Sequence, residues 1–181
     1  MVAEHEAIPV LTAAMMDSSM EEALMTDLST LYKKYASDVF RFALYLSGDR
    51  NQAEDITSET FVRVWTSPEP IEVATVKGYL LTIARNLFLH GLRRRSRHVQ
   101  LDTELPDRQA SPHDQAEQKE EFRAVLVGLQ KLSEIDRAAL LMRALDGMAY
   151  EEISRALGIS LASAKVKIHR ARLALAGIRQ G

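Results

Sequence analysis

Apolar residues in the first part of the chain recur at steps of three and four, which is the period of an amphipathic helix. Between residues 28 and 46 they stand at Leu28, Leu31, Tyr35, Val39, Phe42 and Leu46. Gly48 predicts the end of this helix. Asp49, with Gln52 three residues later, predicts the capped start of a second helix that ends near Trp65. The residues that this second helix turns inward are expected to be Ala53, Ile56, Thr60 and Val64.

A loop and a third helix follow. Residues 66–75 contain Ser67, Pro68 and Pro70, which predict a loop. The third helix is expected over residues 76–95, with one apolar face formed by Leu80, Ile83 and Leu87.

Residues 101–118 are polar, contain two prolines and have no apolar periodicity, which is linker composition. The linker, placed at 99–119, divides the chain into one piece over 26–98 and another over 120–178. Residues 1–25 form an acidic extension that we expect to be disordered. One interpretation is that this extension is an arm that screens the basic surfaces. The other reading is that translation starts at a later methionine, because the extension contains Met15, Met16, Met20 and Met25.

The second piece has the helix start and stop signals of a helix-turn-helix. Its helices are expected over residues 120–129, from Ser133 to Gly147, over 150–157 and over 161–178. Gly158 permits a left-handed turn, and Ser160 can cap the helix after it. We find no convincing strand pattern anywhere in the sequence. The predicted fold is therefore all-α, with two small helical domains joined by a flexible linker.

The last of these helices has one apolar face and basic residues elsewhere. Ala164, Ile168, Ala171 and Leu175 share the apolar face. Such a helix suits the major groove, because arginine and lysine reach guanine edges and phosphates. An ordinary helical hairpin with a basic surface is the alternative. The residues left for DNA are Lys165, Lys167, His169, Arg170 and Arg172.

Charge is strongly segregated along a chain whose formal net charge is only −2. Residues 1–30 carry six acidic residues and no Lys or Arg, and residues 99–121 carry seven acidic and two basic ones. Residues 77–98 carry six basic residues and residues 160–181 carry five, with no acidic residue in either block. Two purely basic blocks suggest two contacts with one polyanion, and attraction to nucleic acid depends on local charge.

Several classes of function are disfavoured. The chain has no cysteine, so a disulfide framework, a thiol nucleophile and a cysteine zinc site are excluded. The five histidines have no metal-ligand spacing, and no nucleophile or nucleotide-binding motif is present. We therefore expect no metal, no cofactor and no catalytic activity. The longest stretch without a charged residue is ten residues, too short for a membrane span, and the acidic start does not resemble a signal peptide, so we expect a cytoplasmic protein.

Three ordered motifs together resemble one protein family. They are the stretch from Gln52 to Trp65, the stretch from Lys77 to Asn86, and the arginine run from Arg93 to Arg95. With the linker and the helix-turn-helix, they resemble the sigma-70 family, specifically the short extracytoplasmic-function (ECF, group four) sigma factors of bacterial RNA polymerase. The resemblance covers residues 26–98 and 120–178.

The resemblance implies a role for each piece. Residues 26–98 are similar to sigma region 2, which docks on core RNA polymerase and captures the single-stranded minus-10 promoter element. The polymerase-binding positions would be Glu54, Asp55, Glu59, Phe61 and Trp65. A flipped base would enter a pocket at the loop over 66–75, and the minus-10 contacts would come from Lys77, Tyr79, Arg85, Asn86, Arg93 and Arg94. From the residues alone, Trp65 is more easily explained as a core residue than as a stacking platform.

Residues 120–178 are similar to sigma region 4, whose recognition helix reads the minus-35 duplex, here with the five basic residues given above. The resemblance also implies an anti-sigma factor that holds the protein until a stress signal. The sequence departs from the family at Gln52, Thr57, Ser58, His90, Ala164 and Val166, which makes the promoter sequence unpredictable. Two alternatives stay open: a sigma mimic that titrates an anti-sigma factor, and a free-standing helix-turn-helix repressor.

Overall fold

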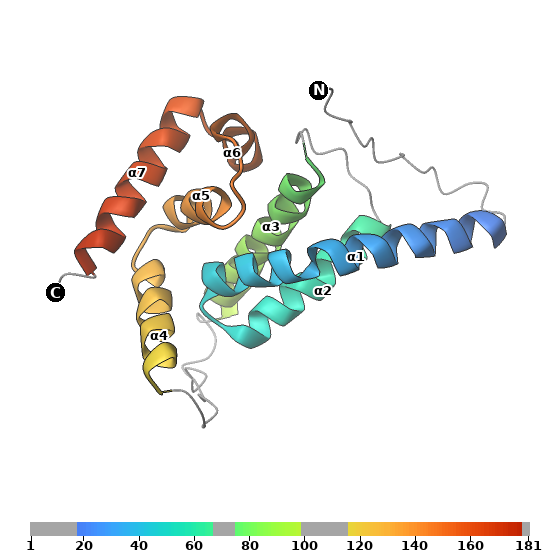
Figure 1. Ribbon diagram of the computed structural model, residues 1–181, viewed down its shortest axis with the longest axis horizontal. Coiled ribbons are helices and arrows are strands. Elements are labelled where there is room, and N and C mark those ends of the chain that lie inside the picture. The colour runs from blue at the N-terminus through green and yellow to red at the C-terminus, as the bar shows by residue number, and fades with distance from the viewer. Residues whose placement is uncertain (1–17, 67–74, 99–115, 179–181) are drawn as a thin grey trace.

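The computed structural model describes residues 18–66, 75–98 and 116–178. The described part of the chain contains seven α-helices and no strand. The first three helices are α1 (Ser18–Ser47), α2 (Arg50–Thr66) and α3 (Val76–His98), and they pack on one another as the first domain (Figure 1). The remaining four form the second domain: α4 (Ala116–Gln130), α5 (Glu134–Ala144), α6 (Tyr150–Leu157) and α7 (Leu161–Ile178). The all-α prediction is confirmed.

The helix ends of the first domain follow the sequence signals. Gly48 closes α1 with a positive φ of 71°, a conformation that other residues adopt only at a cost. The Asp49 carboxylate accepts a hydrogen bond of 2.9 Å from the backbone N–H of Gln52 and so caps α2. The periodic residues then meet in the core, where Val39, Phe42 and Leu46 of α1 are buried.

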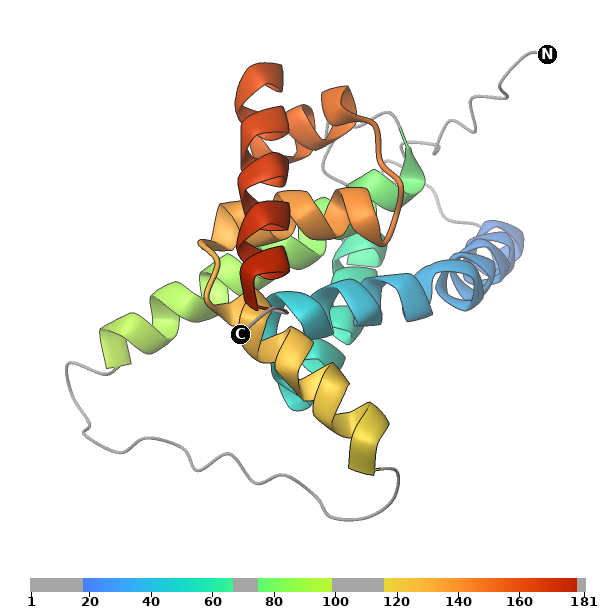
Figure 2. The ribbon, with the colours of Figure 1, turned by 60° about the vertical axis from the view of Figure 1, so that its left-hand side comes forward.

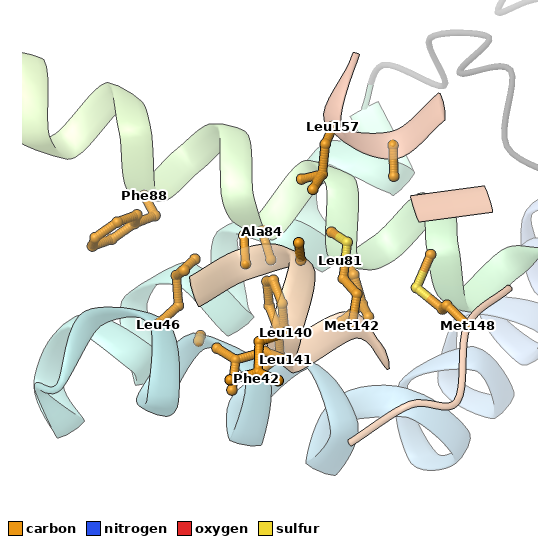
Figure 3. Packing of buried hydrophobic residues seen from close by; sticks show 14 of the residues in the cluster. Phe42, Leu46, Leu81, Ala84, Phe88, Leu140, Leu141, Met142, Met148 and Leu157 are labelled. Atoms are coloured by element: carbon orange, nitrogen blue, oxygen red, sulfur yellow. The ribbon is translucent and has the colours of Figure 1, made fainter. Parts of the chain in front are cut away.

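The two domains pack against each other and share one hydrophobic core. Helices α4 and α5 contact α1, and α6 contacts α3. Figure 3 shows buried side chains of α1 and α3, among them Phe42, Leu81 and Phe88, beside Leu140 and Met142 of α5. The linker between the domains falls within residues 99–115, which lie outside the described part. The folded unit is therefore one two-domain body rather than two separate domains.

Three expectations need correction. Helix α1 begins at Ser18, so the expected disorder of residues 1–25 is wrong for residues 18–25; residues 1–17 are outside the description. The reason is local, because residues 20–25 (MEEALM) are all strong helix formers. Helix α4 likewise begins at Ala116, inside the expected linker. Trp65 is 43% exposed rather than part of the core, because it lies beyond Phe61, the last buried residue of α2.

Helix α3 is buried over more than its predicted face. Besides Leu80 and Ile83, the side chains of Leu81, Ala84 and Phe88 are buried. The extra face is covered because the second domain packs on α3, as Figure 2 shows from another direction. The second domain thereby approaches the residues of α3 that the sequence singled out for DNA.

Candidate nucleic-acid interface

The helix-turn-helix is formed by α6 and α7. Gly158 takes up the left-handed conformation with a φ of 63° and ends α6. The Ser160 hydroxyl accepts a hydrogen bond of 3.1 Å from the backbone N–H of Ser163 and caps α7. Ile153 and Leu157 are buried on one side of the turn, and Ala164 and Ile168 on the other. Packing and capping thus fix the angle between α6 and α7.

Helix α7 carries basic residues on both sides of an exposed apolar strip. Its buried face consists of Ala164, Ile168 and Ala171, with Leu175 half-buried. On the opposite face Val166 is 55% exposed and Leu173 is 60% exposed. At 100° per residue, Lys165, His169 and Arg172 lie on one side of this strip, and Lys167 and Arg170 on the other. A helical projection of the sequence would have found the strip, which our charge-based reading missed.

The basic residues on one side of the strip form ion pairs with an acidic side chain of their own domain. Lys167 Nζ lies 3.3 Å from Asp136 Oδ1, and Arg170 Nη2 lies 3.8 Å from Asp136 Oδ2. Asp136 is buried in the first turn of α5, whose N-cap is Ser133. Because Arg170 is otherwise well exposed, the pair orients its guanidinium without removing it from solvent.

Of the six residues predicted to contact the minus-10 element, Lys77 lies between two carboxylates. Its Nζ is 2.7 Å from Asp38 Oδ2 of α1 and 2.8 Å from Asp146 Oδ1, just after α5. Arg41 of α1 joins this cluster: its Nη2 lies 2.9 Å from Asp38 Oδ1 and 3.9 Å from Asp146 Oδ1. Asp38 and Arg41 are neighbours on α1, but no signal in the sequence brings them together with Lys77 of α3 and with Asp146 in the turn after α5.

The shifts of pKa within this cluster follow from burial. The side chain of Asp146 is fully buried, and loss of hydration raises the pKa of its carboxyl even though Lys77 and Arg41 act in the opposite sense. Burial tends to lower the pKa of Lys77, but Asp146 and Asp38 outweigh it and raise that pKa. Burial dominates the pKa of Asp146 and ion pairing dominates that of Lys77, because Lys77 keeps 26% of its side chain in solvent, whereas Asp146 keeps none.

Arg85 is also engaged with the second domain. Its Nε donates to Glu134 Oε1 at 2.6 Å, and its Nη2 donates to Oε2 at 2.9 Å. This bidentate geometry is the strong form of an arginine–carboxylate pair. Both side chains are largely buried, and Glu134 opens α5.

The other four minus-10 candidates are distributed along α3. Tyr79 is buried, so its ring is part of the domain interior. Asn86 and Arg94 are exposed, as is Arg93, which has contacts of its own within the fold. The set is therefore divided between a half-buried start at Lys77 and an exposed end of the helix. The preceding loop, residues 67–74, is outside the described residues.

Four of the five residues predicted to bind polymerase are exposed on α2. They are Glu54, Asp55, Glu59 and Trp65. Glu54 pairs with Arg50 at 2.9 Å and Glu59 with Arg63 at 3.2 Å, both one helical turn away. Phe61 is buried and packs edge-on against Tyr32 of α1 at 4.8 Å between ring centroids. Its observed contact is with the core of its own domain.

No helix in the described ranges is long and apolar enough to cross a membrane. Within residues 18–66, 75–98 and 116–178, no group of three acidic or histidine side chains is placed to hold a metal ion.

A three-helix domain packed on a helix-turn-helix domain with a basic recognition helix defines a class of two-domain DNA-binding proteins. Models of two family regions match this chain: Sigma-70 region 2 over residues 31–98 and Sigma-70, region 4 over residues 122–175. Among relatives, the ECF RNA polymerase sigma factor SigM of Bacillus subtilis is 32% identical over 80% of this chain and 90% of its own length. SigE of Mycolicibacterium smegmatis, also an ECF RNA polymerase sigma factor, is 32% identical over 88% of this chain and 64% of its own. The chain belongs to the sigma-70 family and is an ECF RNA polymerase sigma factor.

Solved structures share the fold. The sigma factor RpoE in complex with the anti-sigma factor NepR from Bartonella quintana superposes with a TM-score of 0.73 at 24% identity, over 85% of this chain and 97% of that one. CnrH in complex with the cytosolic domain of CnrY gives a TM-score of 0.64 at 19% identity, over 86% and 89%. The two-domain architecture is thus found in other proteins of low sequence identity.

Proposed function

We propose that this sigma factor binds core RNA polymerase, captures the minus-10 element as a single strand with its first domain, and reads the minus-35 duplex with α7. The observation that carries the proposal is the form of α7, a capped helix with one buried face and bases on both sides of its exposed face. On this proposal the chain supplies specificity, and the polymerase supplies the chemistry.

The arrangement of α7 suits a duplex in two ways. Basic side chains on either side of the exposed strip can contact the phosphates along the two walls of a major groove. The strip itself, with Val166 near the start of the helix, faces the groove floor. There an apolar side chain can contact the methyl group of thymine, and Arg170 can reach a guanine edge.

The exposed acidic face of α2 supports the polymerase contact. Glu54, Asp55 and Glu59 lie on its outer side, and Trp65 leaves part of its ring in solvent at the end of the helix. An acidic rim beside an exposed aromatic is the composition of a protein-binding surface. Asn86 and Arg94, on the exposed half of α3, remain available for a single strand.

An inhibitory partner is also part of the proposal. One structural neighbour is a complex of a sigma factor with an anti-sigma factor, and we propose that an anti-sigma factor holds this chain until a stress signal. We place the protein in the cytoplasm, where core polymerase is found, and propose no catalytic role for it.

The test is transcription in vitro with sigma-free core polymerase on fragmented genomic DNA, followed by sequencing of the RNA 5′ ends. Discrete start sites that share two upstream motifs are expected, and they give the promoter directly. Core binding without discrete starts would instead indicate a sigma mimic. Failure to bind core polymerase would leave a free-standing helix-turn-helix regulator.

A further inference from the structure

Two cations proposed for the minus-10 strand are already occupied by the second domain. Arg85 forms its bidentate pair with Glu134, at 2.6 and 2.9 Å. Lys77 lies 2.8 Å from Asp146. Both acidic residues belong to the second domain, at the two ends of α5. The second domain therefore provides the carboxylate that pairs with Arg85 and one of the two that flank Lys77, the other being Asp38 of α1 at 2.7 Å.

These pairs exist because the domains are packed together. The acidic side chains reach α3 only while α5 and α6 lie against the first domain, along the shared core of Figure 3. A hydrogen bond from the Thr75 hydroxyl to the Glu152 carboxylate of α6 crosses the same boundary at the start of α3. Polar contacts thus follow α3 from its first turn to Arg85.

The recognition helix is not covered in this way. Helix α7 packs on α5 and α6, and Figures 1 and 2 show it on the far side of these helices from α3. Lys165, His169 and Arg172 are all exposed on it. The same packing that engages Lys77 and Arg85 leaves the outer face of α7 accessible.

We propose that the packed form of the free protein is blocked for only one of its two DNA contacts: Glu134 of the second domain excludes the minus-10 strand from Arg85, and Asp146 adds to the neutralisation of Lys77 by Asp38, while α7 stays competent for the minus-35 duplex. This inference rests on the proposed assignment of the two cations to the minus-10 strand. Glu134 takes the Nε–Nη2 edge of the Arg85 guanidinium and neutralises its charge, and only 11% of the Arg85 side chain is exposed, so a phosphate has little access to the remaining donors. Single-strand binding therefore requires the domains to separate, and its apparent affinity falls with the fraction of separated molecules.

The first experiment measures two probes on the same full-length protein without polymerase. Fluorescence anisotropy follows a labelled single strand with the minus-10 sequence and a labelled duplex with the minus-35 sequence, both taken from the mapped promoter. Glu134→Lys places a repelling charge opposite Arg85 and leaves every proposed DNA contact intact. We expect it to tighten single-strand binding at least fivefold and to change duplex binding less than twofold. Glu151→Lys, an exposed position on α6, is the matched control for the added charge.

The second experiment fixes the packed form. The chain has no cysteine, so Thr75→Cys with Glu152→Cys provides the only two thiols. A cleavable bismaleimide that joins them is expected to abolish single-strand binding while duplex binding persists, and cleavage is expected to restore the single strand. Because both probes are read on one sample, duplex binding also reports that each variant is folded.

The outcomes separate this inference from the proposed function. If Lys77→Ala with Arg85→Ala impairs minus-10 capture in the polymerase complex, but neither Glu134→Lys nor the cross-link alters single-strand binding, the block does not exist. If the cross-link abolishes duplex binding as well, the block is not selective. If the alanine pair leaves capture in the polymerase complex unchanged, the minus-10 assignment itself is wrong, and the inference fails with it.

Discussion

Lys167 of the recognition helix lies 3.3 Å from Asp136 of α5, and this carboxylate also attracts Arg170 at 3.8 Å. One buried acidic residue therefore offsets part of the charge on one side of α7. The five basic residues of this helix are not equivalent, because Lys165 and Arg172 have no such acidic neighbour among the described ion pairs. On the proposed function, the affinity of this domain for DNA then depends on the balance of the two sides.

Asp136→Asn should strengthen binding to duplex DNA. Lys167 and Arg170 would then be free to neutralise phosphates, and each additional phosphate contact steepens the slope of log K against log salt by about 0.9. The measurement is a salt titration of duplex binding by the full-length protein. Glu151→Gln removes an equal charge from an exposed site and should leave the slope nearly unchanged. Equal effects of both variants would show that only net charge matters.

Val166→Ala should weaken recognition of a thymine in the minus-35 element. On the proposed function, the exposed strip of α7 faces the groove, and loss of one methyl contact costs about 0.8 kcal/mol, roughly fourfold in affinity. The check is a duplex series in which single thymines are replaced by deoxyuridine, which lacks only that methyl. One position should matter for the wild type and lose its effect in Val166→Ala. A uniform response at all positions would remove Val166 from base recognition.

Asp55→Ala with Glu59→Ala should lower affinity for core polymerase without unfolding the first domain. Both residues are exposed on α2, and the Glu59–Arg63 pair at its surface stabilises the fold by at most about 1 kcal/mol. Binding to sigma-free core polymerase is the measurement. Ser58→Ala, between them on the same helix, serves as the control. Unchanged core affinity would move the docking surface elsewhere.

Phe42→Ala should destabilise the whole molecule rather than one domain. Phe42 is completely buried in the core that both domains share, and removal of such a ring costs about 3–5 kcal/mol. Urea unfolding can be followed by circular dichroism and by Trp65, the single tryptophan, which reports on the first domain. Both signals should coincide in the wild type and shift together in the variant. Two separate transitions would show that the domains unfold independently.

Asp146→Asn should be tolerated at neutral pH. Burial raises the pKa of the Asp146 carboxyl, so the folded state favours its neutral form more than the unfolded chain does. The stability that this group contributes is present at low pH and is lost as the pH rises through its raised pKa. The variant should therefore match the wild type near pH 4 and be at least as stable at pH 7. Urea unfolding across this range tests the sign, and a less stable variant at pH 7 would show that pairing with Lys77 outweighs burial.

Much of the fold was predictable because its signals are local. Gly48, Asp49, Ser133, Gly158 and Ser160 mark helix ends through backbone conformation or capping, and each does so in the structure. The docking of the domains was not predictable. Leu81 and Phe88 look like ordinary apolar residues in the sequence, and their burial depends on helices more than forty residues away.

The candidate site divides in the same way. The bases of α7 are close in sequence and share one helix, so their grouping follows from helical geometry. The partners of Lys77 come from α1 and from the turn after α5, at positions 38 and 146. Charge counting along the chain treats residues 77–98 as free positive charge, whereas Lys77 and Arg85 are neutralised by residues distant in sequence.

Gln130, the last residue of α4, donates from its side-chain amide to the carbonyl of Tyr45 at 3.2 Å and lies against the backbone of Gly48. Its amide oxygen accepts from Arg137, which holds it in place. The final turn of α1 is thus completed by a side chain from the other half of the protein. Domain exchange between family members is therefore not a neutral operation. A chimera whose second half carries an apolar residue in place of Gln130 loses the hydrogen bond to the Tyr45 carbonyl at the end of α1, although every residue of its first half is native.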